Sequence, residues 1–255
     1  MDKIRVAVIG AGVVGLSTAV CVAESVPGCS VTVVAEKFSP QTTSDVAAGV
    51  LSPHFSPETP VHRQKRWFED TFAHVYSIAQ TAEAPNIGVQ ILSGWEIFQE
   101  PPVEHIPFWA DSVLAFRVMN DAELKRFPQA IFGWMYTTLL CDCTHYLPWL
   151  EKRLKNAGGR LRSAKIRDFW ELDGTFDIIV NCSGPLTHSQ ESPALSWVEQ
   201  GRKAIGARQP TQTTARQFSR RAVVMNQVSS SLVKECWRPI TVCEDQGFLG
   251  TRWNV

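Results

Sequence analysis

The 255-residue sequence lacks several features that define large classes of proteins. No uncharged apolar stretch is long enough to span a bilayer, so we predict no membrane-spanning helix. The net charge is zero, with 25 Lys and Arg against 25 Asp and Glu, and this balance gives no indication of nucleic-acid binding. The seven cysteines are odd in number and scattered, which argues against a disulfide framework and favours a reducing, intracellular environment.

Motifs for side-chain or metal catalysis are also missing. Cys141 and Cys143 form a C-x-C pair with His145 close by, but no second Cys/His pair at ligand spacing follows. We interpret the two cysteines as alternating residues of a strand. The serines and cysteines show no nucleophile elbow, and the histidines show no triad. The sequence therefore predicts no metal site and no catalytic side chain. Its apolar opening is broken by glycines and is not interpreted as a signal peptide.

The first fifty residues carry a dinucleotide-binding pattern. An apolar strand over residues 4–9 leads into a glycine-rich turn, and an apolar helix follows from Leu16 to about Glu24. A second strand over residues 31–34 ends at Glu36, whose carboxylate can accept hydrogen bonds from ribose hydroxyls. We expect the turn and the helix N-terminus to contact the cofactor phosphates, and the cation of Lys37 to reach a phosphate or stack at the adenosine end. The residues of the turn are Gly10, Ala11, Gly12, Val13, Val14 and Gly15.

A second run of small and hydroxyl-bearing residues, TTSDVAAG at 42–49, follows the acidic strand end. Such residues line a phosphate or a flat ring with little steric bulk, which favours FAD over NAD and makes an NAD-dependent dehydrogenase the weaker alternative. We predict cofactor contacts from Thr43, Ser44, Gly49 and Val50. A later apolar strand ends in Asn-Cys-Ser-Gly, and the carboxyl edge of a parallel sheet is where such folds bind ligands, so we add Cys182 to this site.

Taken together, these segments resemble the D-amino-acid oxidase family, most closely its branch that acts on acidic D-amino acids such as D-aspartate. The resemblance covers residues 1–184 and stops at Gly184. Its motifs are VIGAGVVGLSTAVC (8–21), TTSDVAAG (42–49), SGWEIF (93–98), PFWAD (107–111), Phe116-Arg117, YLPWLEKR (146–153) and DIIVNCSG (177–184).

The resemblance implies an α/β fold with two parts. Residues 1–52 and 141–184 would form a discontinuous Rossmann-like FAD-binding domain, and residues 53–140 would form an inserted, mixed α+β substrate domain with a mixed sheet. Residues 185–255 are polar and aperiodic, so we expect a divergent, poorly ordered tail that adds no βαβ unit and leaves the fold incomplete at the C-terminus. The local patterns predict three helices: one over Trp67–Ala79, one that begins at Asp121 with Asn120 as its N-cap, and one over Tyr146–Asn156. They also predict a hairpin of residues 89–92 and 95–98, and a central parallel strand at 176–180.

The resemblance also implies the chemistry. An FAD-dependent member of this family converts a D-amino acid, O2 and water to a 2-oxo acid, ammonia and hydrogen peroxide. The family's substrate-binding arginines and tyrosine lie in its later half and have no counterpart here. The alternative is therefore an inactive, truncated or alternatively spliced variant that at most binds FAD or a full-length partner. Among the remaining residues, His54 is a weak candidate for contact with the substrate.

The same resemblance leads to expectations about subcellular location and binding partners. The family resides in peroxisomes, but the last three residues, Trp253-Asn254-Val255, are not of the S-K-L type, so we expect this chain in the cytosol. The expected partners are the small-molecule substrate and O2, with neither nucleic acid nor membrane. Homo-oligomerisation is left open.

Overall fold

A computed structural model describes residues 3–53, 56–184 and 222–223 of the chain. His54 and all of 185–255 except Ala222 and Val223 lie outside the described residues. Contacts divide the chain into two compact units, Met1–Val46 with Leu147–Val255, and Ala47–Tyr146. The predicted domain limits, 1–52 with 141–184 and 53–140, stay a prediction.

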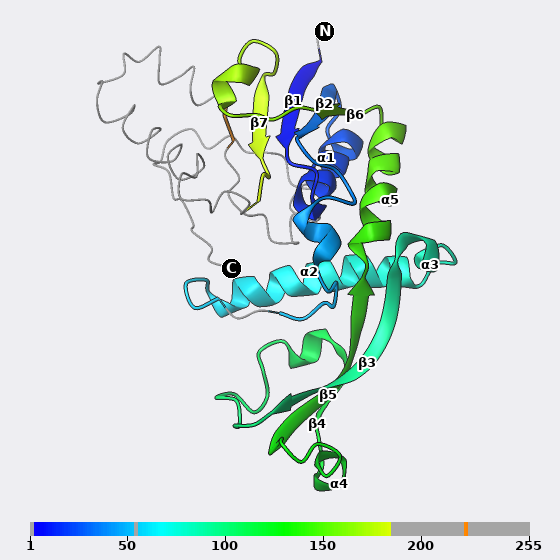
Figure 1. The fold of residues 1–255 in the computed structure, drawn as a ribbon, viewed down its shortest axis with the longest axis vertical. Helices are drawn as coiled ribbons and strands as arrows, with labels where there is room; N and C mark the ends of the chain where they lie inside the picture. Colours follow the sequence, from blue (N-terminus) through cyan, green and yellow to red (C-terminus); the bar gives the residue numbers. More distant parts are fainter. Residues whose placement is uncertain (1–2, 54–55, 185–221, 224–255) are drawn as a thin grey trace, which may run out of the picture. The chain divides into compact units, whose positions relative to one another are not determined.

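The first unit is built on a five-stranded parallel sheet (Figure 1). The strands stand in the order β6-β2-β1-β7-β8. Their bounds are β1 Ile4–Ile9, β2 Cys29–Ala35, β6 Arg160–Ser163, β7 Ile178–Asn181 and β8 Ala222–Val223. The sequence dictates the central strands, because continuous runs of β-branched residues suit a sheet that is buried on both faces. Val8 and Val33 are accordingly fully buried.

Helix α1, Val13–Ser25, joins β1 to β2. From β1 the chain first reaches β2 and β6 on one side of the sheet, and only later β7 on the other side. This reversal at β1 is the topological switch point of a doubly wound fold. The predicted α/β, Rossmann-like fold is thereby observed, and β7 lies in the interior of the parallel sheet, between β1 and β8, as expected for residues 176–180.

Strand β8 adds two residues of the tail to the sheet. Ala222 pairs with Ile179 and Val223 with Val180, both in parallel register. The segment Ala222-Val223 is a short apolar run, and its pairing extends the sheet past β7. A strand of two residues has no sequence pattern that distinguishes it from a loop, so this pairing could not be predicted from the local sequence.

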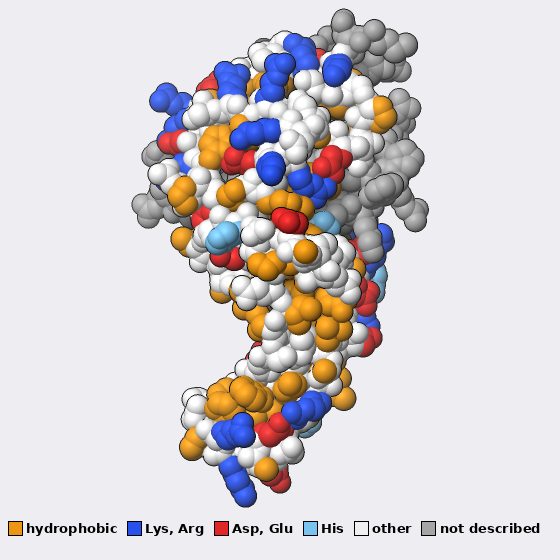
Figure 2. Space-filling view, turned by 90° about the vertical axis from the view of Figure 1, so that its right-hand side faces the viewer, with side chains coloured by type: hydrophobic (Ala, Val, Ile, Leu, Met, Phe, Trp, Pro, Cys, Tyr) orange, Lys and Arg blue, Asp and Glu red, His pale blue; other side chains and the backbone are white. Residues whose placement is uncertain are grey.

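Among the described residues, the sheet of the second unit is antiparallel, where the resemblance implied a mixed sheet. Its strands stand in the order β3-β5-β4, with bounds β3 Val89–Phe98, β4 Leu114–Val118 and β5 Phe132–Cys141. The helices of this unit are α2 Val61–Ala79, α3 Ala84–Ile87, α4 Asp121–Leu124 and the 3-10 turn η2 Ala110–Ser112. Figure 2 shows hydrophobic side chains exposed among charged ones over the part of the molecule that carries this sheet.

The predicted hairpin around Ser93-Gly94 is wrong, because β3 is one uninterrupted strand of ten residues. All ten pair in register with β5, and Gly94 stands opposite Tyr136. Tight hairpin turns require a positive φ at their glycine, whereas Gly94 is not among the glycines with positive φ. The long pairing with β5 therefore overrides the local turn pattern of Ser-Gly.

Three other expectations can be compared with the structure. Helix α4 has Asn120 as its N-cap, with the reciprocal bonds of a capping box to Glu123, as predicted. Helix α2 begins at Val61, before Trp67, directly after Pro60. Helix α5 spans Cys143–Asn156, so Cys143 is not a strand residue: Cys141 ends β5 and Cys143 opens the helix, both of them buried.

Within the described residues, no helix combines the length and apolar character that crossing a bilayer requires.

Candidate functional site

The candidate cofactor site lies at the carboxyl ends of β1 and β7, at the switch point of the parallel sheet. The glycine turn leaves β1 at Gly10, and the N–H of Gly10 donates to the carbonyl of Val34 at 2.9 Å. The N–H of Cys182 donates to the carbonyl of Ile9 at 2.8 Å. These bonds fix the turn between the ends of its two neighbouring strands, where open α/β sheets bind ligands.

Gly10 and Gly15 are required by the backbone around them. Gly10 has a φ of +108°, and a Cβ there would overlap the carbonyl oxygen of Cys182 and come within 2.8 Å of its carbon. A Cβ at Gly15 would overlap the carbonyl oxygen of Gly10 and come within 2.9 Å of its carbon. Both contacts are with backbone atoms, which cannot swing away. These glycines therefore permit the tight turn and the close approach of α1 to β1.

Gly12 differs from Gly10 and Gly15, because the space that a Cβ would enter there is largely open. A Cβ there would meet only the Oγ of Ser44, at 3.1 Å. Gly12 is the N-cap of α1, with an extended backbone and no side chain to cap the first N–H groups. A helix of 13 residues presents free N–H groups and a partial positive charge at this end, which suits an anion.

The Ser44 hydroxyl links the second predicted segment to the first. It accepts a hydrogen bond from the N–H of Val13 at 3.0 Å. Ser44 belongs to the 3-10 turn η1, Thr43–Val46, in which Thr43 is exposed and Ser44 is half-buried. The sequence placed both segments at one cofactor, and the structure brings this pair of residues together.

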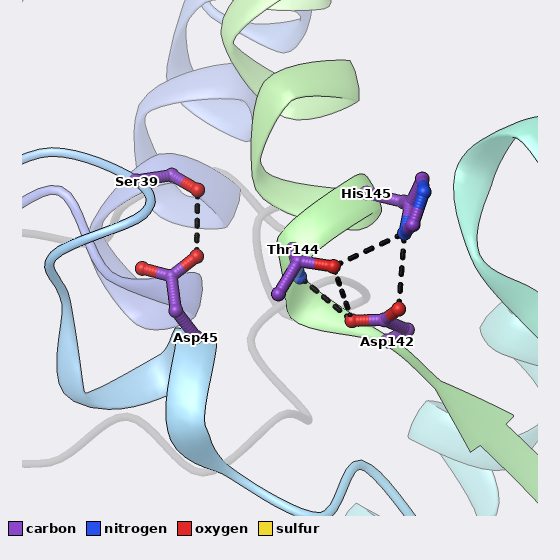
Figure 3. A network of polar contacts seen from close by, with 5 residues as sticks. All are labelled: Ser39, Asp45, Asp142, Thr144 and His145. Atoms are coloured by element: carbon purple, nitrogen blue, oxygen red, sulfur yellow. Dashed lines mark hydrogen bonds and ion pairs between the residues drawn. The ribbon is translucent and has the colours of Figure 1, made fainter.

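Asp45 holds the segment that presents Ser44 (Figure 3). Its Oδ1 accepts from the hydroxyl of Ser39 at 2.6 Å, and its Oδ2 accepts from the N–H and hydroxyl of Thr42 at 2.8 and 2.7 Å. Hydrogen bonds to a carboxylate are stronger than those between neutral groups. The sequence reasoning named this run but gave Asp45 no role. The sequence signal for this role was a carboxylate three residues after Thr42, a spacing typical of turns that are closed by side-chain hydrogen bonds.

The acid that ends β2 has a partner that the sequence reasoning missed. Glu36 lies directly past β2, and its carboxylate accepts from the Nζ of Lys165 at 3.4 Å. Both side chains are more than half exposed, so this pair holds the carboxylate only loosely. Lys37, beside it, is exposed. Glu36 thus remains available to ribose hydroxyls.

Cys182 lies against α1, where burial raises the pKa of its thiol to about 11 and the nearby Thr18 hydroxyl lowers it slightly. Thr18 Oγ1 is itself buried without a hydrogen bond of good geometry in the described part of the chain. The side chain of Asn181 is buried and accepts from the N–H of Ser183 at 3.2 Å, which closes the turn after β7. A thiol with this pKa is a packing group and not a nucleophile at neutral pH.

Gly49 and Val50 belong to the second unit, where they lie against the last residues of β5. Gly49 has a φ of +74°, and a Cβ there would overlap the carbonyl oxygen of Cys141. Val50 bridges to Leu140 in antiparallel register and is exposed. His54, the weak candidate for the substrate, lies outside the described residues. The predicted role of Gly49 and Val50 in cofactor binding stays a prediction.

A second polar cluster in Figure 3 explains where α5 begins. The Oδ1 of Asp142 accepts from the N–H and hydroxyl of Thr144 at 2.9 and 2.7 Å, in the manner of a helix N-cap. His145 Nδ1 lies 3.0 Å from the other oxygen. The bonds from Thr144, followed by that from His145, lower the pKa of the Asp142 carboxyl. His145 is thereby engaged in a cap, and no cluster of metal-ligating residues occurs within the described residues.

The residues present fit FAD. The positive φ of Gly10 and the open space before Gly12 form a cradle that a Cβ would fill. The N-terminus of α1 faces this cradle with Ser44 at its rim, and the Glu36 carboxylate ends the neighbouring strand. These are the donors, the space and the acid that a dinucleotide requires.

Comparison with known proteins agrees with this assignment. A family model described as FAD dependent oxidoreductase matches residues 5–218, and so extends beyond Gly184. Human D-aspartate oxidase is 60% identical over 184 residues, which are 72% of this chain and 54% of the relative. The D-amino acid oxidase of Dugesia ryukyuensis is 33% identical over 183 residues, 71% of this chain and 54% of the relative. The chain thus spans about half the length of the curated relatives it matches.

Solved structures show the same fold at low identity. Glycine oxidase from Geobacillus kaustophilus superposes with a TM-score of 0.52 at 19% identity, over 72% of this chain and 56% of its own. L-Amino acid deaminase from Proteus myxofaciens gives 0.51 at 18% identity, over 73% and 46%. With the family model matching most of the sequence, FAD is confirmed as the cofactor, and the chain belongs to the FAD dependent oxidoreductase family.

Proposed function

We propose that this chain carries out the FAD-dependent oxidative deamination of D-amino acids, with a preference for acidic ones such as D-aspartate. D-aspartate, O2 and H2O would give oxaloacetate, NH3 and H2O2. The observation that carries the proposal is the 60% identity to human D-aspartate oxidase over 184 residues. The site at the switch point supports it, because Gly12, Ser44 and the N-terminus of α1 form a cradle that suits a dinucleotide.

The chain's own residues would hold the cofactor, not perform the oxidation. The bound FAD would supply the acceptor for the hydride of the substrate α-carbon. Gly10 and Gly15 permit the tight turn, Gly12 would let the pyrophosphate approach the backbone, and the N-terminus of α1 would supply N–H donors. Glu36 would accept from the ribose hydroxyls, and Ser44 orients the first turn of α1. Positioning of this kind is the principal contribution of a protein to flavin chemistry.

Two measurements test the proposal. Purified chain supplied with FAD should show the visible absorption of a bound flavin after removal of free cofactor. It should then release hydrogen peroxide with D-aspartate, more slowly with D-alanine and not with L-aspartate. Bound flavin without peroxide from any D-amino acid would refute the proposed activity and favour the variant that binds only FAD or a full-length partner. Absence of bound flavin, with NAD retained instead, would refute the cofactor assignment.

A further inference from the structure

Strand β3 is an edge strand of the antiparallel sheet. It pairs with β5 on one side and, among the described residues, with no strand on the other. Its middle part, residues 90–95, is exposed or half-exposed. An edge strand presents a row of N–H and C=O groups that can pair with a further strand. The outer edge of β3 is therefore a candidate docking surface.

The outward-pointing groups of β3 belong to its odd-numbered residues. The carbonyl of Gly133 on β5 accepts from the N–H of Met119 at 2.8 Å, and Met119 directly follows β4, on the side of β5 away from β3. The even-numbered residues of β5 therefore face β3, and their partners in register are even-numbered too. Ile91, Ser93 and Trp95 consequently turn their N–H and C=O groups away from β5, towards the free edge.

The two edges of this sheet differ in their protection against pairing. Strand β4 has five residues, an irregularity between Leu114 and Arg117, a positive φ at Ala115 and a guanidinium on its edge. Short length, bulges and cations are the usual means of preventing edge-to-edge association. Strand β3 has ten uninterrupted residues without Lys, Arg or Pro. Its one charged side chain, Glu96, accepts from the hydroxyl of Tyr136 at 3.0 Å.

The unprotected edge also carries exposed apolar side chains. Ile91 and Trp95 are 48% and 50% exposed, and they lie on the same face of the strand with Ser93 between them. The Trp95 ring contacts that of Phe127 at 6.0 Å, which leaves half of its surface to solvent. An open edge with apolar side chains favours an apolar strand as its partner and gives no site for an acidic one.

We propose that β3 pairs antiparallel with β3 of a second copy of this chain, about a two-fold axis at Ser93. In this register Ile91 of one protomer stands opposite Trp95 of its partner, and the contact occurs twice. Aromatic and β-branched residues form favourable cross-strand pairs. The outward N–H and C=O groups of all three odd-numbered residues then pair with those of the partner. The inference does not depend on the proposed activity.

The polar side chains on the other face fit the same register. Glu96 of one protomer stands opposite Gln90 of its partner, whose amide N–H can donate to the carboxylate, and no like charges meet. The neighbouring registers that keep the backbone bonds would place Trp95 opposite Ser93 or opposite Val89, which is buried. Side-chain complementarity therefore selects the register centred on Ser93.

The paired sheet would be closed. Its six strands run β4-β5-β3 and then β3-β5-β4 of the partner, so both remaining edges are the protected ones of β4. The pairing over residues 90–96 is about 23 Å long, at about 3.3 Å per residue. An interface based on one strand pair is at the low end of specific interfaces, so we expect a dissociation constant of about 10 μM.

Sedimentation velocity of the full chain with FAD, from about 1 to 200 μM, tests the dimer. Ser93→Pro removes an outward N–H, which an edge strand tolerates, and Trp95→Lys adds a cation to the edge without a change of backbone. Each should weaken dimerisation at least tenfold. Ser93→Ala keeps the N–H, and Val118→Lys places the same charge on β4; both should dimerise like the parent. A parent that stays monomeric, or assembles beyond a dimer, would overturn the proposal, as would an equal loss in Val118→Lys.

Hydrogen exchange of the parent chain locates the contact without any substitution. The amides of Ile91, Ser93 and Trp95 should exchange more slowly at about 200 μM than at about 1 μM, whereas those of β4 should not change. Protection that does not depend on concentration would mean that another segment of the same chain covers the edge, which would overturn the second copy as its occupant. A chain that stays monomeric alone and pairs only with human D-aspartate oxidase would overturn it as well.

Discussion

A series of Gly→Ala variants separates the glycines that the backbone requires from the glycine that leaves space for the cofactor. At Gly15, a Cβ would overlap a carbonyl oxygen of the chain's own backbone. Overpacking of this kind costs about 1–3 kcal/mol, and the better helix propensity of alanine offsets at most about 1 kcal/mol of it. At Gly12 the Cβ would meet a single side-chain oxygen at 3.1 Å. Gly94 has nothing within 4 Å and no positive φ, which makes it the control.

We therefore expect two different losses. Gly15→Ala should unfold at a lower temperature, by about 2–8 °C for a loss of 1–2 kcal/mol in a chain of this size. Gly12→Ala should melt within about 2 °C of the parent and yet bind FAD at least about tenfold more weakly, a difference of about 1.4 kcal/mol. Circular dichroism gives the melting temperature, and quenching of flavin fluorescence gives the affinity. If Gly12→Ala bound FAD like Gly94→Ala, the assigned pyrophosphate position would be wrong.

Three further outcomes are expected. Asp45→Ala removes the three hydrogen bonds that hold the 39–45 turn and should lower the free energy of unfolding in urea by about 1–3 kcal/mol, whereas an unchanged midpoint would show that the turn is held elsewhere. The pKa of Glu123 is lowered from 4.5 to about 2, so its pairing with Arg117 stabilises the fold above pH 4.5 and is lost as the pH falls towards 2. The stability difference between the parent and Arg117→Met should shrink over that window, and a difference constant with pH would contradict this. Because burial raises the pKa of Cys182 to about 11, iodoacetamide at pH 8 should label it far more slowly than a free thiol, as peptide mass analysis would show.

The cofactor half of the site was predictable because its constraints are local. Gly15 is fixed by a clash with the carbonyl of Gly10 in the same turn, and Gly10 has a φ of +108°, which glycine adopts without strain. The parallel strands were equally visible, since continuous apolar runs bounded by glycine or an acid indicate strands buried on both faces. The capping box at Asn120 was predictable for the same reason, because both of its partners lie within one helical turn.

Contacts between distant segments were not predictable in the same way. The bond from Val13 to Ser44 joins residues 31 positions apart, and the ion pair of Glu36 with Lys165 joins residues 129 positions apart. The hairpin expected at Ser93-Gly94 failed for a related reason. Its turn residues are compatible with a strand, and only the pairing of β3 with all ten residues of β5 decides between the two. Such pairing depends on tertiary context and not on propensity.

The same register also decides whether the Glu96 carboxylate and the Tyr136 hydroxyl meet. Side chains alternate along a strand, so a slip of β3 by one residue against β5 would move Glu96 to the opposite face and leave the Tyr136 hydroxyl without its acceptor. An uninterrupted β3 is therefore what places the Glu96 carboxylate within reach of the Tyr136 phenol. A hairpin at Ser93-Gly94 would have separated them.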